Sequence, residues 1–462
     1  MRSKKTEKSS SKRTSGELLV MGARGNHGGL GNFYTRNWRL AALDASSLTP
    51  RVANWQYEDE TRSVSGDHFF DARPYVALKV TSDKQSILLQ PSNITGTSFA
   101  LCARLNNGSV YAWGHPEGGG SLPAPIKDLR NITELSAGMG AFAIRLDSGN
   151  VLAWGLPTSA GVLPDDIAKL NNIDALSGSS YVFVAHQSNG RIVAWGRPDA
   201  GALIPAPVAE LTDIVKARGG QNGFLALRRN GGVVSWGGPY PMPENISLLR
   251  DVRQLACTTY AYAVLRNNGQ VLAWGPDIWG GKLSPEIEPL RDIVDIASCS
   301  RGFAVRRANG KIAAWGHLPP VPEDVAARTD IVHIMGTSNG FVVLCADGSV
   351  NAWADPTGFI SDIPPAIREL RDIFAINANQ NAVVALRSNG IAVAWGDPEG
   401  GGKTTPYTSL LKNIRAVYAG GNTFAALRQD NRVIAWGDDG YGGTGEQKAL
   451  YQMISYANKA VT

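Results

Sequence analysis

One unit of fixed length recurs eight times in this chain of 462 residues. Each unit opens on isoleucine or valine and ends 22 positions later on a tryptophan, as in IVDIASCSRGFAVRRANGKIAAW from Ile293 to Trp315. The connections between units vary from 16 to 20 residues. Length is constrained inside the unit and free outside it, which is typical of a folded module in a repeat protein. The other opening residues are Ile132, Ile173, Ile214, Val252, Ile331, Ile373 and Ile414, and their tryptophans are Trp154, Trp195, Trp236, Trp274, Trp353, Trp395 and Trp436.

A turn pair ends five residues before each of these tryptophans and before a ninth, Trp113, whose unit lacks a regular opening half. Asparagine, aspartate and glycine tolerate the positive φ that tight hairpins need. Both flanks are rich in β-branched and apolar residues, so each unit predicts a lead strand followed by a hairpin. The pairs are Asn107-Gly108, Ser148-Gly149, Asn189-Gly190, Asn230-Gly231, Asn268-Gly269, Asn309-Gly310, Asp347-Gly348, Asn389-Gly390 and Asp430-Asn431.

Three strands of this size cannot bury both faces alone and must stack on their neighbours. A large side chain, most often phenylalanine, stands twelve residues before the tryptophan, and alanine or serine stands just before it. We expect the large ring to pack over the small residue of an adjacent unit. The pattern therefore predicts an all-β fold, a β-propeller of roughly nine three-stranded blades, with an outer lead strand in each blade. An open β-solenoid is the alternative, although its coils are usually shorter and lack a hairpin in each turn.

The segment Leu265 to Gly275, LRNNGQVLAWG, is followed by a Gly/Pro-rich loop and by Leu-Arg-Asp-Ile. This pattern resembles the regulator-of-chromosome-condensation repeat, and the resemblance covers about residues 96–440. The short period is similar to the bacterial branch, typified by a β-lactamase inhibitory protein with three-stranded blades. The resemblance implies a propeller, whereas it says little about function, because the family includes a nucleotide-exchange factor and enzyme inhibitors.

Outside the repeats, three regions are distinguished. Residues 1–16 carry six Lys/Arg against Glu7, which equals the net charge of +5 of the whole chain. This tail is predicted to be disordered, either as a solubilising leader or as an arm for nucleic acid or anionic lipid. No apolar segment typical of a signal peptide follows it, so we expect a cytoplasmic protein or one exported without a cleavable signal. Residues 17–95 predict an irregular β segment, either a degenerate blade or a small appendage. Residues 96–462 form the repeat propeller.

The C-terminus predicts how the ring closes. Tyr451 to Ala460 resembles a lead strand with no hairpin behind it. Since rings commonly close when a strand from one terminus completes a blade begun at the other, we expect this strand to close the ring.

Catalytic and metal-binding patterns are not found in the sequence. The six histidines form no H-x-x-x-H pair, and the four cysteines form no C-x-x-C pair. Cys102, Cys257, Cys299 and Cys345 are instead predicted to be buried free thiols. We therefore expect no enzyme activity, no cofactor and no bound metal.

The loops after the tryptophans differ in length and in nearly every side chain, and all leave the same strand end. A rigid ring carrying such loops on one rim is suited to selective contact with a partner protein, with inhibition of an enzyme as one form. Trp279, in Asp-Ile-Trp-Gly-Gly, is the leading contact residue. The alternatives are a propeller binding a glycan or small ligand, an enzyme or secreted toxin component, and a chromatin-associated exchange factor. The candidate partner-binding residues are Trp279, Tyr240, Met242, Phe359, Tyr407, Tyr441, His115 and His317.

Overall fold

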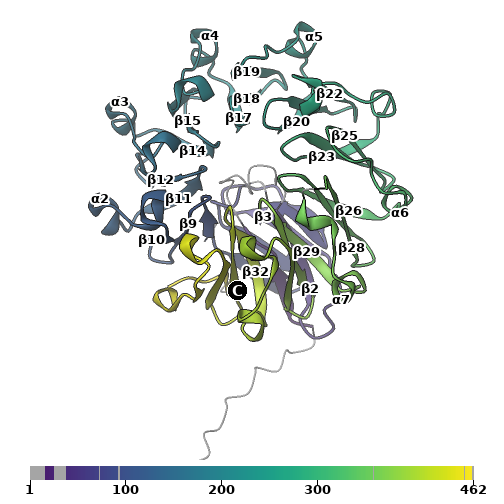
Figure 1. The fold of residues 1–462 in the computed structure, drawn as a ribbon. Coiled ribbons are helices and arrows are strands. Elements are labelled where there is room, and N and C mark those ends of the chain that lie inside the picture. Colours follow the sequence, from purple (N-terminus) through teal and green to yellow (C-terminus); the bar gives the residue numbers. More distant parts are fainter. Residues whose placement is uncertain are drawn as a thin grey trace, which may run out of the picture.

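Nine small antiparallel sheets surround a central opening in the computed structural model of the chain (Figure 1). The structure describes residues 16–24, 38–71, 73–91, 94–356, 358–451 and 453–459. Each sheet is one blade of a β-propeller and holds one repeat tryptophan, and all nine of these tryptophans are buried. The prediction of a propeller with nine blades is confirmed, while the predicted basic tail lies outside the described residues except for Gly16.

The blades are numbered 1 to 9 in chain order. Blade 1 consists of β8 (Ile94–Gly96), β9 (Ala100–Arg104) and β10 (Val110–Gly114); blade 2 of β11 (Ile132–Ala137), β12 (Ala141–Leu146) and β13 (Val151–Gly155); and blade 3 of β14 (Ile173–Gly178), β15 (Val182–Gln187) and β16 (Ile192–Gly196). Blade 4 consists of β17 (Ile214–Gly219), β18 (Gly223–Arg228) and β19 (Val233–Gly237); blade 5 of β20 (Val252–Cys257), β21 (Tyr262–Arg266) and β22 (Val271–Trp274); and blade 6 of β23 (Ile293–Ser298), β24 (Gly302–Arg307) and β25 (Ile312–Gly316). Blade 7 consists of β26 (Ile331–Gly336), β27 (Gly340–Cys345) and β28 (Val350–Ala354); blade 8 of β29 (Ile373–Ala378), β30 (Ala382–Arg387) and β31 (Ala392–Gly396); and blade 9 of β32 (Ile414–Ala419), β33 (Thr423–Arg428), β34 (Val433–Gly437) and β35 (Gly445–Glu446).

Short helices occupy most of the connections between blades. The α-helices are α2 (Ala124–Lys127), α3 (Asp165–Ala168), α4 (Ala206–Ala209), α5 (Glu244–Ser247), α6 (Glu323–Ala326) and α7 (Pro365–Arg368). Single turns of other helical type are η1 (Pro116–Gly120), η2 (Pro157–Ser159), η3 (Pro198–Ala200), η4 (Asp277–Trp279), η5 (Phe359–Ser361), η6 (Pro398–Gly402), η7 (Tyr407–Ser409), η8 (Asp439–Tyr441) and η9 (Lys448–Leu450).

The lead strand of each blade lies nearest the central opening, and the tryptophan strand lies toward the outside (Figure 1). Lead strands of successive blades contact one another, as β11 contacts β14 and β20 contacts β23. The expectation of an outer lead strand was wrong. Radial sheets converge toward the axis, so the innermost strands approach each other most closely, and their side chains line the opening.

The hairpin turns differ slightly from the expectation that both residues of an Asn-Gly pair adopt positive φ. Only the glycine has positive φ, +77° at Gly108, so the turn is a three-residue loop in which the last residue adopts the left-handed conformation. A Cβ at Gly108 would lie 2.2 Å from the carbonyl oxygen of Arg130. The preceding side chain accepts a backbone hydrogen bond two residues on, as Asn107 Oδ1 does from the Ser109 amide at 3.1 Å.

In seven blades an aromatic ring packs on the tryptophan of its own blade, directly across the strand pair, whereas Leu101 and Val383 stand opposite the tryptophan in blades 1 and 8. Phe183 and Trp195 have centroids 5.4 Å apart with an interplanar angle of 28°. This stacked pair packs in one cluster with Ala141, Ala143 and Ala153 of the preceding blade. Small residues on one blade thus receive the aromatic pair of the next blade.

A hydrogen bond repeats along these interfaces. The indole Nε1 of Trp195 donates to the carbonyl oxygen of Ala160, 35 residues earlier, at 3.1 Å, and five other tryptophans repeat this 35-residue spacing. In the ring closure, Trp113 donates to Gly442 at 3.1 Å across 329 residues. Trp274 and Trp353 find no acceptor in the described part of the chain. Both follow the shortest connections, which are too short to bring a carbonyl over the indole.

The most recognisable part of the motif serves the scaffold. In Leu-Arg-Asp-Ile the aspartate pairs with the arginine of the following hairpin, as Asp292 does with Arg307 at 3.0 Å. Asp213–Arg228, Asp251–Arg266 and Asp372–Arg387 repeat this pair. The arginine of Leu-Arg-Asp-Ile caps carbonyls at the end of the preceding segment, as Arg291 does at Glu288 and Leu290.

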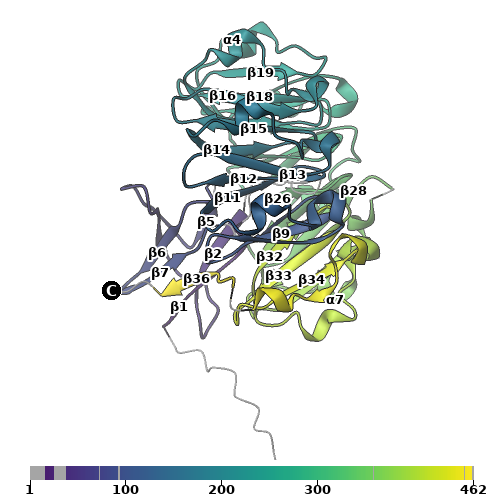
Figure 2. The same ribbon diagram turned by 90° about the vertical axis from the view of Figure 1, so that its left-hand side faces the viewer.

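Residues 17–89 form two further sheets outside the nine blades. One contains β1 (Leu18–Met21), β2 (Trp38–Asp44) and β5 (His68–Asp71); the other contains β3 (Ala53–Tyr57), β4 (Val64–Gly66), β6 (Leu78–Ser82), β7 (Gln85–Leu89) and β36 (Ala457–Lys459). We call these two sheets the appendage. Figure 2 shows them projecting from one side of the ring.

The C-terminal strand does not close the ring as predicted. β36 pairs antiparallel with β7, with Ala457 opposite Leu89. Blade 1 already has three strands of its own, because β8 supplies the lead strand, so no blade edge remains for β36. Closure depends instead on contacts between blades 9 and 1, including the hydrogen bond from the Gly421 amide to the Thr97 carbonyl at 2.9 Å.

The appendage packs against lead strands on one half of the ring. The Gly22 amide donates to the carbonyl of Arg415 in β32 at 2.8 Å, and Arg39 donates to the carbonyl of Phe374 in β29 at 2.6 Å. At its centre the buried Arg24 guanidinium pairs with Asp71 at 2.7 Å. Arg24 also donates to four backbone carbonyls, of Val76 at 2.6 Å, Leu89 at 3.2 Å, Gln90 at 2.5 Å and Arg73 at 3.5 Å.

Candidate functional site

The loops that follow the tryptophans form a rim at the tryptophan end of the strands. The appendage, in contrast, contacts residues near the beginnings of lead strands, which lie at the other end of the blades. The predicted rim residues therefore remain accessible on a side that the appendage does not cover. We call this surface the tryptophan rim.

Trp279 ends η4 and lies over the seam between blades 5 and 6. Its ring meets the ring of Tyr260 edge-on, with centroids 4.9 Å apart, and the Arg301 guanidinium carbon is 5.9 Å from its centroid. Trp279 is half-buried against the core of this seam, and Arg301 is exposed. The neighbouring Ile278 is 62% exposed. The side chain is thus anchored by its blade and still presents part of its surface to solvent.

A second aromatic–arginine pair lies on blade 3. The Arg197 guanidinium carbon is 4.4 Å from the Tyr181 centroid, and the guanidinium also pairs with Asp199 at 2.7 Å. A cation–π contact of this kind holds the arginine side chain in place and leaves the edge of the guanidinium group accessible for binding a partner. The hydrogen bond that Arg197 donates to Asp199 is the main reason why the pKa of Arg197 is raised. This pair and the Trp279 pair lie on the tryptophan rim on either side of blade 4. We call Tyr181, Arg197, Tyr260, Trp279 and Arg301 the rim cluster.

Blade 4 has a short connection after its tryptophan, without the single helical turn that most other blades have there. A depression of about 420 Å³ is lined by Val208 and residues 234–242 of this blade and its connections. Tyr240 is 37% exposed in this depression, while Met242 is half-buried against the core of blade 5.

The other predicted rim residues do not join this cluster. Tyr441 packs edge-on against Phe99 at 5.2 Å and next to His115 at 6.4 Å, at the seam between blades 9 and 1. Tyr407 is half-buried against the core of blades 8 and 9, which is a packing role. Phe359 is 52% exposed on blade 7, and His317 is exposed after Trp315.

Sequence reasoning missed Tyr181, Tyr260, Arg197 and Arg301. A signal was present, because Tyr181, Tyr260 and Arg301 each stand 14 residues before a repeat tryptophan. At this position the backbone carbonyl accepts a hydrogen bond from the residue two after the tryptophan, as Tyr181 does from Arg197 at 3.1 Å. Both positions therefore face the tryptophan rim in every blade.

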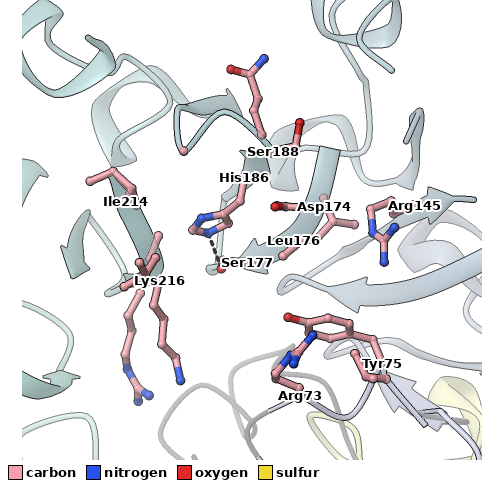
Figure 3. A pocket seen from close by; sticks show the side chains of 18 of the residues that line it. Arg73, Tyr75, Arg145, Asp174, Leu176, Ser177, His186, Ser188, Ile214 and Lys216 are labelled. Carbon is pink, nitrogen blue, oxygen red and sulfur yellow. Dashed lines mark hydrogen bonds between the residues drawn. The ribbon is translucent and has the colours of Figure 1, made fainter. Parts of the chain in front are cut away.

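A larger cavity, of about 720 Å³, lies inside the ring and was not predicted. The lead strands of blades 3 and 4 form one wall, and the appendage forms the other through Arg73, Tyr75 and Val76 (Figure 3). Its charged lining comprises Arg73, Arg145, Lys216, Arg218 and Arg229 against Asp59 and Asp174, five cations against two carboxylates. We call it the channel cavity.

Burial lowers the pKa values of several ionisable side chains around this cavity. Burial of the His186 ring and, to a smaller extent, the charge of Lys216 together lower the pKa of His186 to about 4. Ser177 Oγ lies 3.2 Å from His186 Nε2. Desolvation by the surrounding ring also lowers the pKa of Lys216, although its side chain is exposed on the lining of the cavity. The pKa of Arg218 falls to about 10 for the same reason.

One cluster has the composition of a metal site but is already neutralised. Asp330, Cys345 and Asp347 bring their ligand atoms within 4.8 Å of one another. Arg328 pairs with Asp330 at 2.7 Å and with Asp347 at 2.9 Å. Cys345 stands where other blades have the arginine of the Asp–Arg pair, and Arg328 supplies that charge. The cluster is a variant of the scaffold ion pair. All four cysteines are buried free thiols, as the sequence predicted.

The family model for the regulator of chromosome condensation (RCC1) repeat matches residues 414–442, within blade 9. This blade therefore matches an RCC1 repeat, and the other blades repeat its turn and tryptophan at the same spacing. The finer assignment to the short-period bacterial branch stays a prediction. The search of curated proteins found no match.

Several solved propellers are similar at low identity. Prp20p from Saccharomyces cerevisiae shares 17% identity, with 72% of this chain and 91% of that chain covered and a TM-score of 0.40. The CRINKLY WD40 ectodomain of the receptor kinase ACR4 from Arabidopsis thaliana shares 14%, covering 57% and 97%, with a TM-score of 0.36. BamB from Moraxella catarrhalis shares 12%, covering 66% and 94%, with a TM-score of 0.32. In the part of the chain that the structure describes, no helix is long and apolar enough to cross a membrane.

Proposed function

We propose that this protein is a non-catalytic propeller that recognises another protein through the tryptophan rim, centred on the rim cluster. The observation that carries the proposal is the anchored and partly exposed Trp279, held edge-on by Tyr260 with Arg301 beside it. Tryptophan, tyrosine and arginine are the residues most enriched at energetic hot spots of protein interfaces. Prp20p, a similar structure, is described in terms of its binding to Gsp1p and histones. Inhibition of an enzyme is one form that this recognition would take.

The fixed geometry of the cluster supports this proposal. Arg197 is held by Tyr181 and Asp199, so little side-chain freedom would be lost when a partner binds. Blade 4, between these two pairs along the ring, carries a depression lined by Tyr240 and Met242, in which a protruding side chain or loop of a partner would fit. A glycan-binding propeller would need similar aromatic and polar residues in every loop, and the loops here differ.

The test is affinity capture from the native source with the full chain, followed by measurement of the dissociation constant for the captured partner. Trp279→Ala is expected to weaken binding by about 2 kcal/mol or more and to leave folding intact. Tyr441→Ala is the matched control, because Tyr441 stands at the same position relative to its tryptophan, on the opposite part of the rim. If Tyr441→Ala weakens binding and Trp279→Ala does not, the contact surface lies at the seam of blades 9 and 1, and the proposal is wrong.

A further inference from the structure

We propose that the channel cavity binds a small phosphorylated organic molecule of about nucleotide size, held between the appendage and blades 2 to 4. This site is separate from the tryptophan rim and does not depend on the function proposed there.

The charges of the cavity are not balanced by the protein itself. Arg73 is paired with Asp59 and with Glu60, and Arg145 is paired with Glu134 at 3.1 Å. Lys216 and Arg229, both from blade 4, have no carboxylate partner among the described residues. Both side chains are exposed on the lining of the cavity, and an anion bound there would supply the opposite charge.

The positions of the cations favour a ligand with more than one anionic group. Lys216 lies on the wall formed by β17, whereas Arg73 and Arg145 lie on the side of the appendage and blade 2 (Figure 3). Arginine and lysine are side chains that commonly hold phosphate oxygens. A ligand that contacts the cations of both walls would need more than one anionic group.

The size and the remaining lining favour an organic ligand. A cavity of about 720 Å³ is in the range of pockets for small molecules and cofactors. Tyr75, Leu176 and Val215 contribute aromatic and apolar surface next to the cations. The Tyr75 hydroxyl points into the cavity (Figure 3), and burial raises the pKa of Tyr75 to about 12, so it would act as a neutral hydrogen-bond donor.

Isothermal titration calorimetry with the full chain at near-physiological salt tests the proposal. The probes are ATP, myo-inositol hexakisphosphate, inorganic pyrophosphate, inorganic phosphate and adenosine. We expect the organic phosphates to bind most tightly, pyrophosphate more weakly, and phosphate and adenosine least. Lys216→Gln should weaken binding about tenfold, and the double variant Lys216→Gln, Arg229→Gln about a hundredfold, since each removes one charge-assisted contact.

Lys311→Gln is the matched control, because Lys311 is exposed on a hairpin turn of blade 6, away from the cavity lining. It should bind the probes as the unchanged chain does, and circular dichroism should show that every variant is folded. Three outcomes overturn the proposal: no probe binds below 1 mM, as measured in the same titration; Lys216→Gln binds normally; or Lys311→Gln weakens binding as much, which would indicate general attraction of anions to the surface. The rim variants Trp279→Ala and Tyr441→Ala should bind every probe normally.

Discussion

The two halves of the ring use the same repeat but differ where the lead strands face the centre. In blades 8 and 9, which the appendage covers, the cross-strand pairs beside the bulge are Ala375–Leu386 and Ala416–Leu427. In blades 3 and 4, which line the channel cavity, the same positions hold Ala175–His186 and Lys216–Leu227. At these positions, the two blades covered by the appendage have only apolar residues, whereas each of the two blades that line the cavity has one ionisable residue. The repeated residues determine the structure of each blade, whereas the lead-strand residues that face the axis differ from blade to blade.

The largest expected effect comes from removing a repeat tryptophan in each half. Trp195→Ala should lower the free energy of unfolding by about 3–5 kcal/mol, because a buried stacked ring is lost. Trp436→Ala should cost at least as much, since its cluster also includes Leu19 and Met21 of the appendage. Thermal and urea unfolding measure both changes. Equal and small losses would show that the tryptophans do not hold the blades together.

The buried ion pair of the appendage is the next test. Asp71→Asn leaves the Arg24 charge without its counter-charge and should cost about 3 kcal/mol or more. Hydrogen exchange should locate the loss in the appendage and in β29 and β32, while blades 3 to 6 keep their protection. Uniform loss over all nine blades would instead mean that the appendage and ring unfold as one unit.

The lowered pKa of His186, which lies in blade 3 on the lining of the channel cavity, predicts that the free energy of unfolding depends on pH. Burial, followed by the charge of Lys216, lowers the pKa of His186 to about 4 in the folded protein, against about 6.5 when unfolded. The unfolded state therefore binds the proton more strongly, so the stabilising contribution is complete above pH 6.5 and is lost as pH falls toward 4. The loss should reach at most about 3 kcal/mol.

His186→Leu introduces the residue that blades 8 and 9 have at this position and should remove that part of the pH dependence. Urea unfolding at pH 7.0 and pH 4.5 compares the two proteins, and acid effects on other groups are common to both. Parallel losses of stability in the two proteins would contradict the assignment to His186.

Smaller effects should distinguish tryptophans with and without an indole acceptor. Trp195→Phe removes the hydrogen bond to Ala160 and should cost about 1 kcal/mol more than Trp274→Phe, whose indole has no acceptor among the described residues. Denaturant unfolding of both variants gives this difference directly. A reversed order would show that the indole bond adds nothing to the blade interface.

The smallest effect is expected for the partly exposed scaffold ion pairs. Asp213→Asn breaks the contact with Arg228, in which both side chains are about a quarter exposed, and should cost no more than about 0.5 kcal/mol. It serves as the exposed counterpart of Asp71→Asn. If the two substitutions cost the same, burial is not what distinguishes the appendage pair.

Much of the fold could be predicted from local pattern. A left-handed backbone requires glycine at the hairpin turn, or Asn431 in blade 9, and the packing between blades requires the tryptophan, so both positions recur at fixed spacing. Loop position was predictable for the same reason, and Trp279 lies on the predicted rim. The residues that contact Trp279 could not be predicted, because Tyr260 and Arg301 come from strand ends in two different blades and meet only when those blades pack.

The sequence by itself determined the blade, its hairpin, its buried aromatic pair and the number of repeats, because these depend on interactions within one unit and its nearest neighbour. Only the tertiary structure decided which strand faces the axis, where β36 pairs and what the appendage covers. The channel cavity depends on all three. Its residues come from β14, β17 and the appendage, so the excess positive charge exists only once segments distant in the sequence have been brought around one opening.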